Sequence, residues 1–255
     1  MKNYIILLGA FFSFLSLFSQ QVLMNEVALP QQVYGEVQQS EGLLPMNDLG
    51  IQSGYVLYQA TIEAISDNPV LEIENVRDYA SVYIDNQFQG ELVGNNNKLE
   101  LHVVAGKYTL ALYAENIGRI TYGPEILDNS KGLFGSVTLD GEAIEGWAMT
   151  VLDVRDCPVK NLKFMTNHLS PVPGFYKGTF AFADPDNIYL DMSGWGMGEV
   201  WINGEYQGAY WEKSPQKTIQ IDPAILKKEK NEIVVFDLKY MGEKIVNMIS
   251  APLFK

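Results

Sequence analysis

The sequence predicts an all-β protein made of two tandem β-sandwich domains of the jelly-roll type. Three observations support this prediction: many short alternating apolar segments, little helical periodicity, and an internal repeat. Runs rich in Val, Ile, Tyr, Phe and Thr, bounded by Gly, Asn, Asp or Pro, are typical of sandwiches and barrels. The expected strands, in chain order, lie at 55–62, 80–88, 98–104, 107–115, 135–141, 178–183, 187–192, 199–208, 217–222 and 231–239.

The first twenty residues have the layout of a secretory signal peptide. Lys2 precedes an uncharged apolar run over residues 5–18, and polar residues follow from Ser19 onward. This run is shorter than the roughly 20 apolar residues that a spanning helix needs, although a membrane anchor is the alternative. We therefore expect residues 1–20 to be cleaved, and the protein to be secreted or periplasmic with no membrane span after cleavage.

An internal repeat organises the remainder of the chain. The segment VYIDNQFQG at 82–90 recurs without a gap as VWINGEYQG at 200–208, and the same offset aligns Tyr58 and Thr61 with Tyr176 and Thr179. Two separate matches in one register indicate two copies of one structural unit. The expected organisation is an N-terminal extension at 21–50, a first sandwich at 51–145 and a second at 146–255.

Each copy of the repeat predicts a tight hairpin. Asp85-Asn86 and Asn203-Gly204 stand between strand-like runs, and these dipeptides tolerate the positive φ of a type I′ turn. Strand alternation places Val200 and Ile202 on the inter-sheet face and Trp201 on the outer or domain-interface face. A single helical segment is expected at 222–231, where Asp222 can cap the helix and a proline follows.

Charge and composition exclude several classes of function. The formal net charge is −13, which disfavours binding to a phosphate backbone, so we expect no nucleic-acid partner. The only cysteine is Cys157, so no intramolecular disulfide can form, and we expect it to be a buried small side chain. No phosphate-binding, zinc-binding or serine-nucleophile motif occurs. We expect no metal and no cofactor, and we interpret the acidic loop at 183–187 as a solvated turn.

Several segments resemble family 35 glycoside hydrolases, the β-galactosidases, over roughly residues 43–240. The resemblance begins with LLPMNDLGIQSGYVLYQATI at 43–62 and continues with AENIGRITYGPEILDNSKGLFGSVTLDG at 114–141, PGFYKGTFAF at 173–182, LDMSGWGMGEVWINGEYQGAYW at 190–211 and KTIQIDPAILKKEKNEIVVFDL at 217–238. It implies two jelly-roll, galactose-binding-like domains of the kind that follow the catalytic barrel. The family signature EN-x-GR-x-x-YG falls on Glu115, Asn116, Gly118, Arg119, Tyr122 and Gly123.

The same resemblance implies that catalysis belongs to a part of the family that this sequence lacks. Family 35 enzymes carry two catalytic glutamates on an N-terminal (β/α)₈ barrel, and such a barrel needs about 250 residues. Only residues 21–50 separate the expected signal peptide from the first sandwich, so no catalytic residue is assigned. The family's GRYW is Gly208-Ala209-Tyr210-Trp211 here, so its arginine is missing.

The candidate binding residues are aromatic or belong to the signature. An exposed aromatic ring can stack on the C–H face of a sugar, but it can equally pack against a neighbouring domain. An arginine fork suits carboxylates and vicinal hydroxyls, or a structural ion pair that fixes a loop. The candidates for carbohydrate contact are Trp195, Trp201, Tyr206, Tyr210, Trp211, Arg119 and Tyr122.

Together these observations predict an exported, non-catalytic carbohydrate-binding or accessory module that acts in bacterial glycan use. The expected partner is a galactoside-type carbohydrate or a separate glycoside hydrolase chain, and a homo-oligomer is possible. Two alternatives stay open: glycoside hydrolase activity, alone or completed by a separate barrel chain, and a structural or interaction role.

Overall fold

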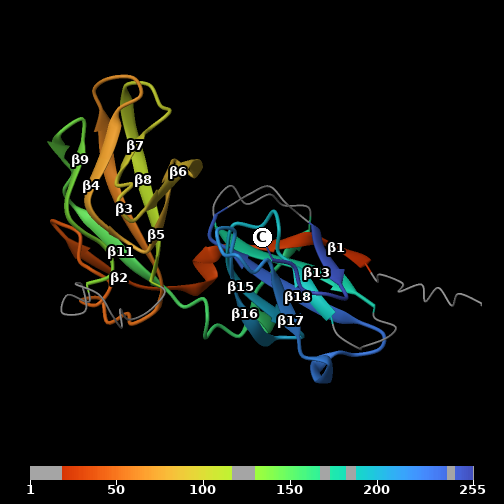
Figure 1. Ribbon diagram of the computed structural model, residues 1–255. Helices are drawn as coiled ribbons and strands as arrows, with labels where there is room; N and C mark the ends of the chain where they lie inside the picture. Colours follow the sequence, from red (N-terminus) through yellow and green to blue (C-terminus); the bar gives the residue numbers. More distant parts are fainter. Residues whose placement is uncertain (1–18, 117–129, 167–172, 182–187, 240–244, 255) are drawn as a thin grey trace, which may run out of the picture.

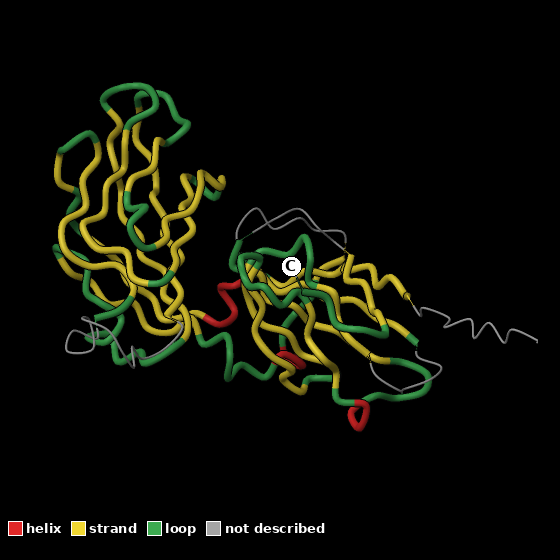
Figure 2. Tube along the Cα trace, viewed as in Figure 1, coloured by secondary structure: helices red, strands yellow, loops and turns green. Residues whose placement is uncertain are grey.

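The computed structural model describes residues 19–116, 130–166, 173–181, 188–239 and 245–254, which form two β-sandwiches (Figure 1). Strands and loops make up almost all of the described chain, and helix is confined to short single turns (Figure 2). The all-β prediction is therefore confirmed. None of the helices in the described ranges is long and apolar enough to cross a membrane.

The first sandwich packs a six-stranded sheet against a four-stranded sheet, and its core lies between them. In sheet order, the larger sheet contains β2 (Tyr34–Ser40), β11 (Trp147–Leu152), β3 (Gly54–Ala64), β8 (Gly106–Asn116), β5 (Tyr79–Ile84) and β6 (Gln87–Val93). The smaller sheet contains β10 (Glu142–Ala143), β9 (Gly132–Leu139), β4 (Val70–Arg77) and β7 (Lys98–Glu100).

The second sandwich is one continuous nine-stranded sheet that folds into two layers. Its strands, in sheet order, are β16 (Glu205–Trp211), β15 (Met197–Ile202), β18 (Asn231–Asp237), β13 (Gly174–Phe180), β1 (Ser19–Ala28), β19 (Ile245–Ile249), β14 (Ile188–Asp191) and β17 (Thr218–Ile221), and β12 (Met165–Thr166) pairs with β1. The strand β1 joins the layers, because its first half pairs with β19 and its second half with β13.

This pairing corrects the domain boundaries that the sequence predicts. The strand β1, expected partly in a signal peptide and partly in a separate extension, is a central strand of the second sandwich. Residues 147–152, expected within the second sandwich, form the strand β11, which instead pairs with β2 and β3 in the first. The repeat could not reveal this exchange. The neighbour of β3 is β11, which follows the other strands of its sandwich in the sequence, whereas the neighbour of β13 is β1, which precedes them.

The internal repeat is confirmed in three dimensions. The order β3-β8-β5-β6 in the first sandwich matches β13-β18-β15-β16 in the second. Both predicted turns have positive φ at both central residues, 46° and 67° at Asp85-Asn86 and 52° and 82° at Asn203-Gly204. The ladders also shift register at equivalent positions, after Val82 and after Val200. Each copy therefore carries the same hairpin with the same bulge.

The predicted helix at 222–231 is much shorter in the structure. Only η4 (Pro223–Ile225) is helical, in 3₁₀ form, with the Asp222 carboxylate accepting from Ala224 N at 2.9 Å as predicted. The chain turns extended at Leu226, and the side chain of Asn231 then binds both backbone groups of Lys227. These side-chain hydrogen bonds replace the ones that a longer helix would make.

The outer faces of the two large sheets pack against each other and form what we call the interdomain core. Its aromatic members include Tyr55 and Tyr83 from the first sandwich and Phe175, Trp201 and Phe236 from the second. The Tyr55 and Phe236 ring centroids lie 5.2 Å apart in an edge-on arrangement. The predicted division of faces is confirmed, because Val200 and Ile202 lie in the core of the second sandwich whereas Trp201 lies between the domains.

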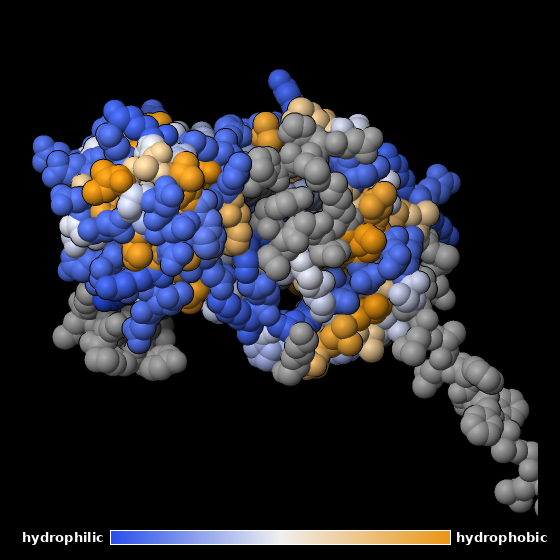
Figure 3. All heavy atoms as spheres, turned by 90° about the horizontal axis from the view of Figure 1, so that it is seen from above, coloured by the Kyte–Doolittle hydropathy of each residue, from blue (hydrophilic) through white to orange (hydrophobic). Residues whose placement is uncertain are grey.

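The surface seen from above is mostly hydrophilic, with apolar side chains in scattered spots on both sandwiches (Figure 3). Equivalent positions of the two hairpins carry exposed aromatic rings, Phe88 at 38% and Tyr206 at 44%. Each of these rings packs edge-on against the buried aromatic of its own hairpin, Phe88 on Tyr83 and Tyr206 on Trp201. The hairpins therefore continue the interdomain core toward solvent.

Candidate functional site

A pocket of about 510 Å³ runs along the strand β16 and faces β17, and we call it the β16 pocket. Its walls are largely amide, hydroxyl and aromatic side chains. The lining residues are Glu115, Met197, Gln207, Gly208, Ala209, Tyr210, Trp211, Ser214, Gln216, Lys217, Thr218, Ile219 and Gln220. All of them except Glu115 belong to the second sandwich.

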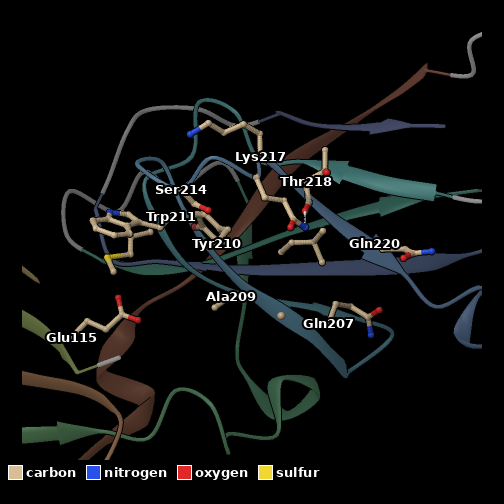
Figure 4. A pocket seen from close by; sticks show the side chains of 13 residues that line it. Glu115, Gln207, Ala209, Tyr210, Trp211, Ser214, Lys217, Thr218 and Gln220 are labelled. Carbon is tan, nitrogen blue, oxygen red and sulfur yellow. Dashed lines mark hydrogen bonds between the residues drawn. The ribbon is translucent and has the colours of Figure 1, made fainter. Parts of the chain in front are cut away.

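Figure 4 shows how these residues are arranged. Glu115 comes from the first sandwich and points toward the Trp211 end of β16, to the left of Ala209 in this view. Lys217 lies on the opposite side, and its ammonium donates to the carbonyl of Glu212. The indole N–H of Trp211 is buried and finds no hydrogen-bond acceptor in the part of the chain that the structure describes. This N–H is closed off from solvent, so it is the lining side chains, and not this donor, that a ligand in the pocket would meet.

A buried polar cluster lies beside the pocket, between the domains. The carboxylate of Glu199 is fully buried, and its Oε1 accepts from Arg155 Nη2 at 2.7 Å and from Arg155 Nε at 3.2 Å. The same oxygen accepts from the Tyr55 hydroxyl at 3.1 Å, and Oε2 accepts from the Tyr206 hydroxyl. Glu199 is therefore paired and hydrogen-bonded on both oxygens, as a buried charge requires.

Glu115 is the exception in this cluster. Its Oε1 lies 3.4 Å from the Tyr55 hydroxyl, while its Oε2 is buried and has no partner among the described residues. Burial, and next the Glu199 carboxylate, raise the pKa of Glu115 to about 8. At neutral pH this side chain is therefore mainly a protonated carboxylic acid.

The structure separates the sequence-predicted aromatic candidates into two groups. Trp195 and Trp201 are 1% and 2% exposed, so neither ring has a face open to a sugar. Trp195 belongs to the core of the second sandwich, where its indole donates to the carbonyl of Ile245 at 2.9 Å. Trp201 belongs to the interdomain core. Both positions correct the expectation of carbohydrate contact and agree with the packing alternative.

The other predicted residues lie nearer to the pocket. Tyr210 and Trp211 line it, although the Tyr210 hydroxyl is committed to the carbonyl of Phe236 at 3.0 Å. Tyr206 is the exposed ring that hydrogen-bonds Glu199, outside the pocket lining. Arg119, Tyr122 and the acidic loop at 183–187 lie outside the described residues.

Sequence reasoning missed the polar residues of the site. Glu199 lies two residues before Trp201 and therefore on the same face of β15. The available signal was a charged residue on a face that the sequence predicts to lie outside or between the domains. Gln207 stood out only as part of the repeated hairpin, and Ser214 and Gln216 carried no motif, because only the approach of β17 to β16 brings these residues together. Cys157 is buried, and burial raises the pKa of its thiol to about 11, in keeping with the expected structural role.

Comparison with known protein families matches both sandwiches. Residues 44–153 match the model described as "Beta-galactosidase, first all-beta domain", and residues 173–231 match "Beta-galactosidase, galactose-binding domain". This chain carries the all-β and galactose-binding domains of the β-galactosidases. The first match ends beside β11, in agreement with the strand pairing, and the second includes most of the β16 pocket.

Curated relatives give the same assignment. The chain is 34% identical over 182 residues to the β-galactosidase of Xanthomonas manihotis, covering 71% of this chain and 30% of the relative. It is 31% identical over 210 residues to human β-galactosidase-1-like protein 3, covering 79% and 31%, and 32% identical over 228 residues to the β-galactosidase of Felis catus, covering 78% and 34%. The chain thus spans about a third of the length of the relatives it matches.

Proposed function

We propose that this protein is an exported, non-catalytic module that binds a galactoside-type carbohydrate in the β16 pocket of its galactose-binding domain. The observation that carries the proposal is the pocket itself, with its amide, hydroxyl and aromatic lining. Its volume of about 510 Å³ falls within the range of small-molecule sites. The match to a galactose-binding domain supports galactose as the sugar to test first.

The chemistry of the pocket suits a neutral polyol. Sugar hydroxyls both donate and accept, so they can pair with the amide and hydroxyl side chains of the lining, such as Gln207, Ser214 and Gln220. Trp211 adds aromatic surface that the C–H face of a sugar can contact.

The internal repeat supplies a matched control for this proposal. Gln207 and Gln89 occupy the same position in the two hairpins, and each side-chain oxygen accepts a backbone N–H, from Asp222 at 3.4 Å and from His102 at 2.8 Å. Only Gln207 lines the β16 pocket. Replacing each residue with Ala therefore removes a comparable local interaction but changes the pocket in one case only.

The test is calorimetric titration with galactose-terminated and glucose-terminated oligosaccharides. We expect saturable binding that favours galactose, weakened about tenfold by Gln207→Ala because about one hydrogen bond to the ligand is lost. Gln89→Ala should bind as the natural protein does. Absence of saturable binding, or equal losses in both variants, would reject the proposal.

A second candidate is an accessory role beside a separate glycoside hydrolase chain. The chain spans about a third of its β-galactosidase relatives, so those relatives contain a further part that this chain does not match. We expect the purified protein to release nothing from an aryl β-galactoside above the buffer control. Release by the purified protein would instead favour the hydrolase alternative.

Export and assembly are tested separately. The apolar run at 5–18 supports a cleaved leader, and β1 begins at Ser19 and pairs with β19 from its first residue. Cell fractionation with N-terminal sequencing should find a mature protein outside the cytoplasm that begins close to Ser19. Light scattering of that species decides between a monomer and a homo-oligomer.

A further inference from the structure

A second pocket, of about 610 Å³, lies at the tip of the β15–β16 hairpin, beyond the start of β16. Four lysines surround it, Lys160, Lys227, Lys228 and Lys230, together with Asn203, Glu229 and Glu232, and we call it the lysine pocket. Four positive charges therefore face two negative ones, on a chain whose formal net charge is −13. The local charge has the opposite sign to that of the molecule.

The backbone around this pocket is fixed by asparagine side chains. Asn203 Nδ2 donates to the carbonyl of Ile225 at 2.8 Å and to Asn231 Oδ1 at 2.9 Å. Asn231 is fully buried, and its side chain in turn binds the N–H and the carbonyl of Lys227 at 2.8 and 2.7 Å. The turn and the lysine loop are thus tied together, so the lysines are attached to a rigid frame.

Lys160, which comes from the linker between the domains, packs against the Asn203-Gly204 turn. Lys160 lies in the short helix η3 (Val159–Asn161), and a Cβ atom added to Gly204 would overlap its side chain. Glycine at this position, with φ of 82°, therefore lets the aliphatic part of Lys160 lie directly on the hairpin. Lys160 thus joins the lining of the pocket from a segment of the chain distant from the 227–230 loop.

The ammonium groups are poorly neutralised within the protein. Lys230 lies 3.9 Å from Glu232, and both side chains are largely exposed, which makes a weak pair. For Lys160, Lys227 and Lys228, no carboxylate of the described ranges lies within 4.0 Å. An external anion would therefore meet charges that are mostly free.

The first sandwich shows that the fold does not require these lysines. At the equivalent corner, Asp85 Oδ1 accepts from Thr109 N at 2.9 Å, as Asn203 Oδ1 accepts from Glu232 N at 3.0 Å. In the register set by these two bonds, the residues that take the place of Lys227–Lys230 are Val-Ala-Gly-Lys at 104–107. The same junction is thus built with a single lysine, Lys107, so the fold does not require the other lysines of the pocket.

We propose that the lysine pocket binds the anionic substituent, sulfate or carboxylate, of an acidic glycan. Lysine ammonium groups are compact point charges with rotatable donors, which suits an oxyanion presented on a flexible sugar chain. A nucleic acid is a poorer fit, because its extended phosphate backbone would also meet the acidic surface around the pocket. The site is separate from the β16 pocket, so it does not depend on the galactoside proposal.

The test compares glycans of equal length on the full protein: a neutral galactan oligosaccharide, its sulfated form, its carboxylated form, and a single-stranded DNA of similar charge. We expect the acidic glycans to bind about 10- to 100-fold more tightly than the neutral one at low salt. This preference should fall as ionic strength rises, because exposed charges are screened. The two acidic forms show which substituent the pocket prefers.

The decisive variant is Lys160→Gln combined with Lys228→Gln. This double variant should abolish the preference for acidic glycans. Lys163→Gln should keep the preference, because Lys163 is exposed, lies three residues from Lys160 and is outside the pocket. Gln207→Ala should also keep it, which separates failure here from failure of the galactoside proposal. Equal binding of neutral and acidic glycans, a preference that survives the double variant, or DNA binding as tight as glycan binding would overturn the inference.

Discussion

The buried carboxyl of Glu115 makes the stability of this protein depend on pH in a specific direction. Its pKa is about 8 in the folded protein, against an ordinary value of 4.5, because burial and the Glu199 carboxylate disfavour the charged form. Arg155 and the Tyr55 hydrogen bond act in the opposite sense, and Asp78 adds to the rise. The folded state therefore holds a proton that the unfolded chain releases between these two pH values.

The sign follows from this difference in bound protons. Below pH 4.5 both states are protonated at Glu115, and the stability associated with the neutral form is fully present. As pH rises to 8 only the unfolded state loses the proton, so the free energy of unfolding falls by about 1.4 kcal/mol per pH unit. Over the whole interval the loss is about 5 kcal/mol, which is comparable to the total stability of a small domain.

The substitution Glu115→Gln tests this account, because glutamine has the shape of the protonated acid and does not titrate. A neutral side chain at 115 can donate to the Tyr55 hydroxyl while Tyr55 donates to Glu199, so the hydrogen-bond chain remains intact. Denaturant unfolding at pH 5, 7 and 9 should show little effect of the variant at pH 5. The variant should be several kcal/mol more stable than the natural protein at pH 9.

A matched control is Glu36→Gln, an exposed position on β2. This variant should keep the dependence of the free energy of unfolding on pH that the natural protein shows. Part of that dependence comes from buried Asp237, because burial raises the pKa of its carboxyl to about 7. Parallel pH profiles for the natural protein and Glu115→Gln would refute the reasoning. Such a result would mean that Glu115 is ionised or solvated in the folded state.

Three further predictions concern the interdomain region and the topology. Arg155→Met should cost about 3 kcal/mol, because it leaves the fully buried Glu199 carboxylate without its cation. Adding Glu199→Gln to that variant should restore part of the loss in denaturant unfolding, and strictly additive losses would contradict the pairing. Trp201→Ala should cost about 3–5 kcal/mol and speed protease cleavage of the 153–164 linker, whereas unchanged cleavage would mean that the domains do not depend on this contact. Removing residues 1–28 should leave β13 and β19 with unpaired edges, so limited proteolysis should degrade the second sandwich and spare residues 34–152. A protease-resistant second sandwich in that truncated protein would show that β1 is dispensable.

Much of the fold could be predicted because it is encoded locally. The turns at Asp85-Asn86 and Asn203-Gly204 need residues that tolerate positive φ, and the alternation around Trp201 separates the two faces of β15. The repeat extended these local signals to the whole domain pair. What escaped prediction was non-local: β1 and β11 take equivalent places in the two sheets, but β1 precedes the other strands of its sandwich in the sequence and β11 follows those of its own. No local pattern records that choice.

The candidate site was less predictable, for a related physical reason. Aromatic residues such as Trp195 and Trp201 have the same composition signal whether they pack in a core or contact a sugar, and only burial distinguishes the two. The pocket itself arises where β17 approaches β16 and where Glu115 arrives from the other domain. Neither event is visible from the spacing of residues within one strand.

The most direct test of the proposed function is a crystal structure of the protein soaked with a galactose-terminated disaccharide. We predict that the sugar lies in the β16 pocket between Gln207 and Trp211, with one hydroxyl hydrogen-bonded to the Gln207 side chain. A sugar bound elsewhere on the second sandwich, or an empty pocket at a concentration that saturates binding in solution, would contradict the proposal.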